Sequence, residues 1–252
     1  MSVESDVLAL WGAPRTVSTA FERMVRERGD HDVSFEPFAA HYYFSADRCS
    51  SRFDGEVEPH AEHAFDAILD DLRDRARHRP VFIKDMAYHV VGRVDAAFLS
   101  AFRHTFIVRH PRFAIASLAR IWPDFTLEEA GFAALRDLYD AVAEHDGRSP
   151  IVIDGEELLA DPRGVVATWC EAVGLAYLPE ALTWEPRRDD DWRTWSVWTE
   201  DVARSRGLPV EGAPRPARDG DEHRLDDPRL EEVVDACLPD YEHIAAHRIA
   251  AS

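Results

Sequence analysis

The chain has 252 residues, which is enough for one large α/β domain or for a domain with a tail, and we expect one domain. It carries 48 acidic and 29 basic residues, and the net charge of −19 argues against non-specific binding to nucleic acid or anionic lipid. The three cysteines are far apart and lack the spacing of a zinc or redox motif, so no metal site is predicted. A polyanionic ligand would therefore need a local basic pocket.

The beginning of the chain shows no secretory signal. Residues 1–6 are polar and acidic, without a basic region that leads into an apolar run. The apolar run at 7–12 soon meets Pro14 and Arg15, so it is too short to span a membrane. We expect a soluble, cytoplasmic protein with no membrane or nucleic-acid partner. The oligomeric state stays open, and a homodimer is one candidate.

Short apolar strands alternate with amphipathic helices along the first half. Val7–Trp11 is predicted as a buried strand that leads into a turn, and Thr16–Arg28 as a helix that stops at Gly29. The next elements are expected in chain order: a strand at 32–35, a loop with irregular helix at 39–58, an amphipathic helix at 59–77, a strand at 80–86 and a helix at 90–102.

The same alternation continues in the second half and then gives way to a different composition. Here the expected elements are a strand at 104–108, a helix from Pro111 to about Ile121, helices at 127–144 and 161–173, and a strand at 151–154. Trp192, Trp195 and Trp198 recur every three residues like one helix face, which is typical of core but could line an acceptor pocket. Residues 204–227, rich in Pro, Gly and charge, are predicted as a flexible loop or lid, and 228–249 as a C-terminal helix.

This order of elements predicts an α/β fold with three layers. The short strands would form a parallel sheet of about five strands with helices on both faces, in one domain over residues 1–252. Ligands of such sheets bind at the carboxyl ends of the strands. The functional residues are therefore sought where the predicted strands end.

A first candidate phosphate site follows the first strand. Backbone N–H groups from Arg15 to Thr19 precede a helix, whose N-terminus attracts a phosphate, and Arg15, Thr16, Ser18 and Thr19 add a charge and three hydroxyls. The Gly-x4-Gly-Lys-Ser/Thr spacing of a Walker A loop is absent, which weakens an NTPase or kinase interpretation. Taken alone, the segment could equally be a helix cap with Arg15 on the surface.

A second candidate phosphate site lies one strand and helix further along. Arg109 ends a predicted strand, and Ser117 lies on the helix that follows Pro111. A guanidinium fork and a hydroxyl together suit a terminal phosphate. The alternative is that Arg109 is a surface charge at a strand end.

The two segments resemble the 5′-phosphosulfate loop and the 3′-phosphate motif, Arg-x-Pro-x5-Ser, of PAPS-dependent sulfotransferases. The resemblance implies a P-loop NTPase-like fold of the sulfotransferase type, with PAPS (3′-phosphoadenosine 5′-phosphosulfate) as co-substrate, PAP (adenosine 3′,5′-bisphosphate) as product, and no metal. It implies that Arg109 and Ser117 bind the 3′-phosphate, and that Arg15, Thr16, Val17, Ser18 and Thr19 bind the 5′-phosphosulfate. Two features depart from that pattern: the family's loop usually has Lys where this chain has Arg15 and a Ser/Thr-Gly pair at 16–17, and its Gly-rich basic segment near the C-terminus is not clearly matched.

Residues 7 to about 208 are also similar to a P-loop, sulfotransferase-like group, some of whose plant members are named after branched-chain aminotransferases. The shared motifs are Trp-x-x-Pro-Arg-x-x-Ser-Thr at 11–19, Glu-Pro at 36–37, Lys-x-Met-Ala at 84–87, Arg-x-Pro at 109–111, Asp-x-Glu-x-Leu at 154–158 and Trp-Glu at 184–185. No lysine lies in a context that suggests a PLP Schiff base, so an aminotransferase activity is not expected.

Three residues are candidates for the base that accepts the acceptor's proton. Glu36, at a strand end before Pro37, resembles the general base of some bacterial sulfotransferases and is the first choice. His89 is placed loosely like the catalytic histidine of other sulfotransferases, although a structural role is favoured for it, and Asp85 comes third. Lys84, at the end of a strand, could stabilise the transferring group, or it could be a surface lysine.

The leading hypothesis is a PAPS-dependent sulfotransferase that acts on a hydroxyl or amine of a small molecule. The first alternative is an ATP-dependent phosphotransferase, which would require Mg²⁺ and ligands for it that the loop does not obviously offer. The second is a nucleotide-binding protein without turnover. The identity of the acceptor does not follow from the sequence, because acceptor pockets lie in variable loops.

Overall fold

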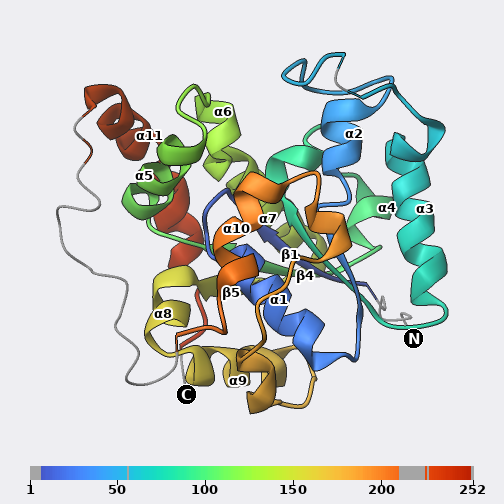
Figure 1. Cartoon of the computed structure of the whole chain (residues 1–252), viewed down its shortest axis with the longest axis vertical. Helices are drawn as coiled ribbons and strands as arrows, with labels where there is room; N and C mark the ends of the chain where they lie inside the picture. Colours follow the sequence, from blue (N-terminus) through green and yellow to red (C-terminus); the bar gives the residue numbers. More distant parts are fainter. Residues whose placement is uncertain (1–6, 56, 210–224, 226, 251–252) are drawn as a thin grey trace.

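The structure is a computed structural model that describes residues 7–55, 57–209, 225 and 227–250. Its centre is a single parallel sheet with the strand order β2-β3-β1-β4-β5 (Figure 1). The strands are β1 (Val7–Gly12), β2 (Asp32–Phe35), β3 (Val81–Met86), β4 (Arg103–Val108) and β5 (Ile151–Asp154). The predicted five-stranded parallel sheet is confirmed.

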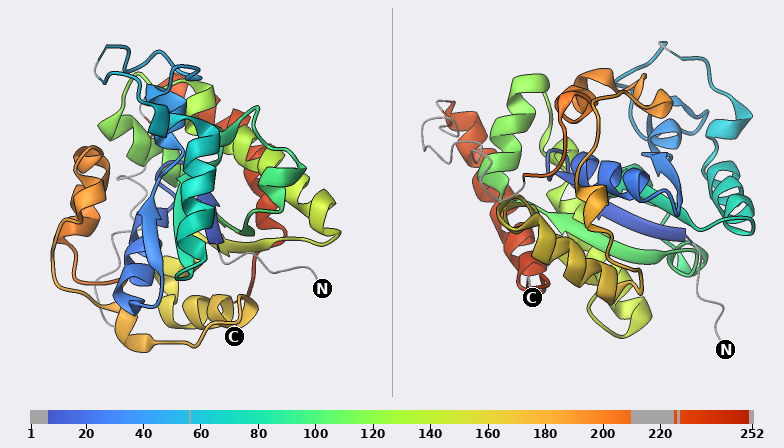
Figure 2. Two further views of the ribbon diagram at one scale, coloured as in Figure 1. Left: turned by 90° about the vertical axis from the view of Figure 1, so that its right-hand side faces the viewer. Right: turned by 60° about the horizontal axis from the view of Figure 1, so that its bottom comes forward.

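Strand β1 is apolar throughout because both of its faces are covered. Leu8 and Leu10 pack into one core with α1 (Ser18–Arg28) and α9 (Pro162–Ala172). Ala9 and Trp11 point to the other face, since successive side chains of a strand alternate, and they join a second core. That core contains residues of α3 (Phe65–Ala76), α7 (Phe132–Asp146) and α11 (Pro228–Ala245) (Figure 2). Helices on both faces of the sheet are therefore also confirmed.

Two predicted helices are wrong in extent, and a glycine explains each difference. The helix expected over 90–102 is replaced by a 3₁₀ turn, η2 (Ala87–Val90), and a short helix, α4 (Ala96–Leu99). Gly92 has φ +77°, and Asp95 begins α4 by accepting a hydrogen bond from the Phe98 N–H at 2.8 Å. The helix expected over 127–144 is divided into α6 (Leu127–Ala130) and α7 at Gly131, which has φ +79°. A Cβ at Gly131 would lie 3.1 Å from Pro14 and Tyr88, so this glycine also allows close packing.

Several short elements were not predicted as such. Helix α5 (Pro111–Ile121) has the predicted bounds, but α8 (Gly155–Ala160) was missed. Asp154 begins α8 by accepting hydrogen bonds from the N–H groups of Glu156 and Glu157. The irregular stretch expected at 39–58 contains α2 (Ala39–Phe44), and α3 starts at Phe65, preceded by the 3₁₀ turn η1 (Ala61–His63).

The C-terminal third combines 3₁₀ turns with two helices. Turns η3 (Pro179–Leu182) and η4 (Asp190–Trp192) precede α10 (Ser196–Arg204), so the three tryptophans at 192, 195 and 198 do not share one helix. The start of the predicted loop at 204–227 is packed, because Leu208 is buried and its N–H donates to Leu182 O at 3.0 Å. Residues 210–224 and 226 of that loop lie outside the described residues. Helix α11 ends at Ala245, where the sequence suggested 249.

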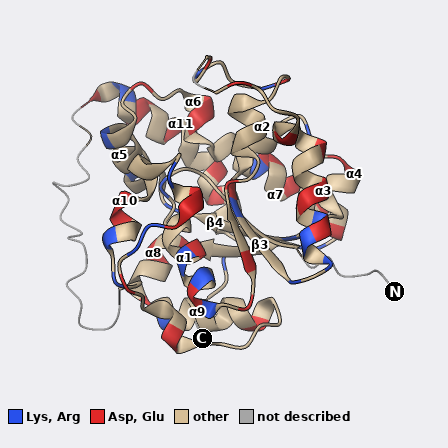
Figure 3. Ribbon diagram, turned by 45° about the vertical axis from the view of Figure 1, so that its right-hand side comes forward, with Lys and Arg blue, Asp and Glu red and all other residues tan. Residues whose placement is uncertain are grey.

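Acidic residues are spread over helices on both faces of the sheet (Figure 3). Within residues 7–55, 57–209 and 227–250, no helix combines the length and the apolar character needed to cross a membrane.

Candidate functional site

A cavity of about 740 Å³ lies at the carboxyl ends of the strands. Its wall is built by the segments that follow each of the five strands, together with α5 and α10. These segments contribute Arg15, Val17, Ser18 and Thr19 after β1, Glu36 after β2, Tyr88 and His89 after β3, Arg109 and Ser117 after β4, and Glu156 after β5. The position agrees with the rule that ligands of parallel α/β sheets bind at this edge.

The loop between β1 and α1 has an unusual backbone. Arg15 and Val17 have φ values of 65° and 70°, in the left-handed region that β-branched residues rarely adopt. Val17 stands where the resembling loop has glycine, and it is the N-cap residue of α1 but supplies no side-chain hydrogen bond. No side chain therefore caps the first turn of α1, in which the Ala20 N–H donates to Val17 O at 3.1 Å, and a helix N-terminus without a side-chain cap suits an anion.

The predicted loop residues do not all face the cavity. Val17, Ser18 and Thr19 line it, whereas the Thr16 side chain is fully buried and is not part of its wall. The Thr16 hydroxyl donates to Ala13 O at 2.8 Å. Thr16 thus holds the turn in shape through its side chain.

The two predicted phosphate segments meet through Arg15. Its Nε donates a hydrogen bond to Ser117 Oγ at 2.9 Å, and its terminal nitrogens contact Trp198 O at 3.2 Å and Asp201 Oδ2 at 3.4 Å. Burial lowers the pKa of Arg15 from its ordinary value, while nearby Asp201 opposes the shift. Arg15 is therefore a half-buried cation between the N-terminus of α1 and helix α5.

Arg109 and Ser117, predicted to bind one phosphate together, do not hydrogen-bond to each other directly. Arg109 donates to Glu156 Oε1 at 2.7 Å and to Arg15 O at 3.3 Å, while Ser117 contacts Arg15. Arg109 and Ser117 line the same cavity, but no hydrogen bond joins them. A phosphate between them would replace these contacts within the protein.

The charges of the cavity wall are mostly paired. Each of the three lining carboxylates forms an ion pair with a lining cation, in the pairs Glu36–Lys84, Glu156–Arg109 and Asp201–Arg15. Arg120 also lines the cavity and has no acidic partner among the described residues. Arg120 was not among the predicted site residues, although it lies three residues after Ser117 and thus on the same helix face. The wall therefore has an excess of positive charge in a strongly acidic protein.

Glu36 and Lys84 form a pair at the ends of β2 and β3. Glu36 has φ 46°, and its N–H donates to Lys84 O at 2.7 Å. The Lys84 side chain is fully buried, its Nζ contacts Glu36 Oε1, and it lies 4.2 Å from the centroid of the Phe35 ring. Lys84 is the single lysine of the chain, and its burial rules out the alternative of a surface lysine.

Asp85 and His89 form a second buried pair. His89 is 1% exposed, and its Nδ1 lies 2.6 Å from Asp85 Oδ1. Asp85 also accepts hydrogen bonds from the N–H groups of Phe38 and Met86, at 2.8 Å and 2.7 Å. Because a carboxylate only accepts, Nδ1 of a neutral His89 carries the proton and Nε2 is left as an acceptor. Nε2 is buried without a hydrogen-bond partner, and His89 lines the cavity, whereas Asp85 does not.

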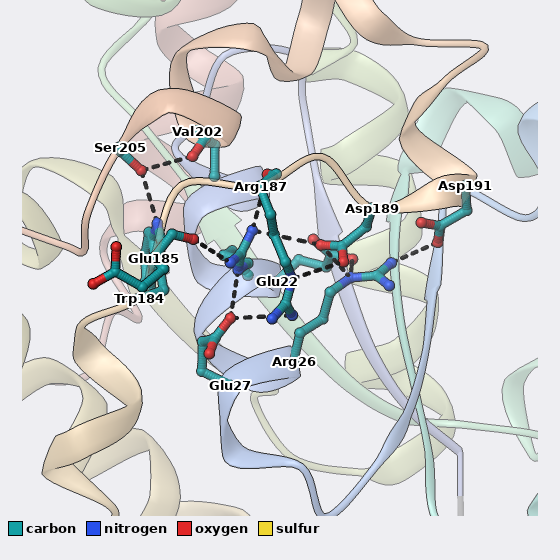
Figure 4. Close-up of polar contacts among 11 residues, drawn as sticks. Glu22, Arg26, Glu27, Trp184, Glu185, Arg187, Asp189, Asp191, Val202 and Ser205 are labelled. Atoms are coloured by element: carbon teal, nitrogen blue, oxygen red, sulfur yellow. Dashed lines mark hydrogen bonds and ion pairs between the residues drawn. The ribbon is translucent and has the colours of Figure 1, made fainter.

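An ion-pair network holds the segment before α10 against α1 (Figure 4). Arg26 contacts both Glu22 and Asp191 at 2.5 Å, and Arg23 donates to the carbonyl oxygens of Glu185 and Arg187. Burial raises the pKa of Glu22 to about 7, and the positive charge of Arg26 offsets only part of this. The network fixes the approach to Trp195, Trp198, Asp201 and Val202, which close one side of the cavity.

In the described part of the chain, no group of three or more His, Cys, Asp or Glu side chains is arranged to hold a metal ion.

Comparison with known families and curated proteins gives two findings. A family model described as "Sulfotransferase domain" matches residues 6–244. Two proteins of Arabidopsis thaliana, named branched-chain-amino-acid aminotransferase-like proteins 2 and 1, are each 24% identical to this chain over 213 and 209 residues, or 81% of it. The chain spans only 36% and 37% of the length of these relatives.

Solved structures give two distant similarities. The sulfotransferase domain from the Synechococcus PCC 7002 olefin synthase is 15% identical with a TM-score of 0.44, and the match covers 96% of this chain and 94% of that one. The sulfotransferase domain from the curacin biosynthetic pathway is 14% identical with a TM-score of 0.48, covering 96% and 99%.

Proposed function

The chain belongs to the sulfotransferase domain family, and from this we propose that it transfers a sulfuryl group from PAPS to a small acceptor. The observation that carries the proposal is the hydrogen bond from Arg15 to Ser117, which brings the N-terminus of α1 and the Arg109–Ser117 segment into one cavity. A nucleotide with phosphates on both its 5′ and 3′ positions could occupy both places at once.

The phosphates of the nucleotide would replace carboxylates of the protein as the partners of two arginines. The 5′-phosphosulfate would accept hydrogen bonds from backbone N–H groups at the first turn of α1, and the positive charge of Arg15 would attract it. The 3′-phosphate would accept hydrogen bonds from Arg109 and Ser117, with Arg120 as a further cation. Because Arg109 already pairs with Glu156, and Arg15 with Asp201, these two ion pairs must break before the phosphates can bind.

The transfer itself needs a nucleophile, a base and charge stabilisation. The acceptor oxygen or nitrogen attacks sulfur, and the bond from sulfur to the oxygen that bridges it to phosphorus breaks, so PAP leaves. Arg15 and Lys84 would stabilise the negative charge on the departing phosphate. The acceptor's proton passes to a base, for which we propose Glu36, because its carboxylate lines the cavity beside Lys84.

A specific observation makes His89 the second candidate for the base. Its Nε2 is a buried acceptor with no partner, and Asp85 orients the ring through Nδ1. Glu36, in contrast, already contacts Lys84, so this carboxylate must leave its cation or share it during the reaction.

The two candidates are separated by comparing Glu36→Gln with His89→Gln. Loss of the base should lower the rate of transfer at saturating PAPS by about 100-fold or more. The affinity for PAP should stay within about twofold of that of the unchanged protein, which shows that the cavity is intact. Transfer that persists undiminished in both variants would contradict both assignments.

The phosphotransferase alternative has less support. Kinases of this kind hold Mg²⁺ through a loop hydroxyl and an Asp. Here the Thr16 side chain is buried outside the cavity wall, and the three carboxylates that line the cavity are already paired with cations. The direct test is incubation with PAPS labelled in the sulfuryl group, with a panel of alcohols and amines, and detection of labelled product together with PAP. Phosphoryl transfer from Mg-ATP, without any sulfuryl transfer from PAPS, would overturn the proposal.

A further inference from the structure

Part of the cavity wall is a group of aromatic rings. Tyr43, Phe53 and Trp195 form a compact group, with ring centroids 4.9 Å apart for Tyr43 and Phe53, 5.8 Å for Tyr43 and Trp195, and 6.0 Å for Phe53 and Trp195. Tyr88 and Met86 extend this wall toward β3. Such a wall offers apolar contact area to a flat ligand.

The aromatic wall carries no net charge of its own. The hydroxyls of Tyr43 and Tyr88 lie 3.3 Å apart, and burial raises the pKa of both, so neither ionises near neutral pH. The adjacent charges, Glu36 and Lys84, are paired with each other. An acceptor with a charged body would therefore find no free counter-ion on this side.

Beside this wall lies one buried polar atom that has no hydrogen-bond partner among the described residues. His89 Nε2 is buried, and the imidazole ring lies 4.4 Å from the Tyr88 ring centroid and 5.5 Å from that of Tyr43. A neutral Nε2 accepts one hydrogen bond, and a buried acceptor without a partner costs free energy. A single hydroxyl on the ligand would satisfy it.

The wall is held in place by contacts with neighbouring residues. Arg52, next to Phe53, contacts Glu129 at 2.7 Å and Asp124 at 2.9 Å, and its guanidinium stacks on Trp122 at 4.4 Å. On the other side, the Phe44 ring stacks on Trp195 with centroids 6.1 Å apart. These contacts preform the aromatic surface, which reduces the entropy lost on binding.

From these observations we infer that the aromatic wall is the acceptor subsite, and that it takes an uncharged alcohol on a flat, apolar body. The hydroxyl lies at His89 Nε2, in the cavity that Glu36 and Lys84 also line, and the body lies against Tyr43, Phe53 and Trp195. The inference rests on the proposed sulfuryl transfer and adds the class of acceptor to it.

The test uses three probes with the same ring system: 2-naphthalenemethanol, 2-naphthoate and 2-naphthylmethylammonium. Each is titrated into the full chain by NMR, with and without PAP, and PAP affinity is measured separately by calorimetry. The alcohol should bind more tightly than either ion. Tighter binding of the ammonium would overturn the inference and indicate a cage for cations.

Two variants locate the probe. Phe53→Ala and Trp195→Ala should each weaken binding of the alcohol about tenfold, which corresponds to about 1.4 kcal/mol, and leave PAP affinity within about twofold. Tyr177→Ala is the control, because Tyr177 packs on the core beside α1 and does not line the cavity. Phe53→Leu repeats the test if the alanine variant fails to fold.

The two proposals fail in different ways. Alcohol affinity unchanged in the Phe53 and Trp195 variants, with PAP still bound, would overturn the acceptor subsite alone. Absence of PAP binding to the unchanged protein would overturn the proposed function, while the binding of the alcohol would still locate the apolar subsite.

Discussion

Arg15 Nε donates a hydrogen bond to Ser117 Oγ across 102 residues of sequence. The contact joins the turn after β1 to helix α5, so a ligand that reaches one of these segments lies next to the other. In the proposed function, nucleotide phosphates bind Arg15 and Arg109, which now pair with Asp201 and Glu156. Under that proposal, the two carboxylates are in competition with the nucleotide for these cations.

This competition predicts that Asp201→Asn strengthens PAP binding. The Asp201 side chain is 86% exposed and lies 3.4 Å from Arg15, so the pair contributes roughly 0 to 1 kcal/mol, and we expect affinity to rise by up to about fivefold. Calorimetry at low and moderate salt measures the effect. Asp190→Asn is the control, because Asp190 pairs with Arg193 and does not line the cavity. Weaker binding in Asp201→Asn would show that this carboxylate supports the nucleotide.

The pair of Lys84 with Glu36 can be observed directly. Since Lys84 is the only lysine, protein labelled with ¹⁵N-lysine should give one side-chain ammonium signal. We expect this signal to be visible at neutral pH, because the buried ion pair slows exchange with water, and to broaden in Glu36→Gln. An identical signal in the two proteins would mean that the pair does not persist in solution.

Because the pKa of Glu22 is raised in the folded state, its contribution to the free energy of unfolding should decrease as the pH rises. Its folded pKa of about 7 lies above the ordinary carboxyl value of 4.5 because of burial, so between these values the folded state keeps a proton that the unfolded state has lost. The free energy of unfolding, taken relative to Glu22→Gln, should therefore fall by roughly 3 kcal/mol from pH 4.5 to pH 7 and then level off. Urea unfolding of both proteins across this range measures it. A difference independent of pH would contradict the raised pKa.

Because the backbone at Val17 is left-handed, we expect a glycine at this position to destabilise the protein less than a glycine at a comparable valine. Val17 and Val33 are both partly buried against the same core, but Val33 lies in the extended strand β2. Glycine relieves the left-handed strain at position 17 and nothing comparable at position 33. Val17→Gly should therefore cost at least about 1 kcal/mol less stability than Val33→Gly, as measured by urea unfolding. An equal loss in the two variants would argue against strain at Val17.

The parts of the fold predicted well from sequence are those with a local cause. Strands β1 and β3 begin with apolar runs and are buried along their whole length, and Pro111 marks the start of α5. The helices were misjudged where a glycine takes a positive φ, as at Gly131, because the apolar spacing continues across the break. Helix α8 was missed because its cap, Asp154, is also the last residue of β5.

The candidate site was predicted in its residues more than in its contacts. Glu36, Lys84 and Arg109 were predicted at strand ends, and all three line one cavity in the structure. It could not show that Glu36 pairs with Lys84, since side-chain partners far apart in sequence depend on strand order and register. The burial of His89 also depends on contacts far apart in sequence, so it could not be predicted. A structural role was favoured for this residue, which lines the cavity in the structure.

The central claim is that this cavity binds a nucleotide with a 3′-phosphate. Calorimetry with PAP, adenosine 5′-phosphate and Mg-ATP tests it most directly, in the unchanged chain and in Arg109→Ala. We predict that PAP binds most tightly and that Arg109→Ala removes most of its advantage over adenosine 5′-phosphate. A preference for Mg-ATP, or equal affinity for PAP and adenosine 5′-phosphate in the unchanged chain, would contradict the claim.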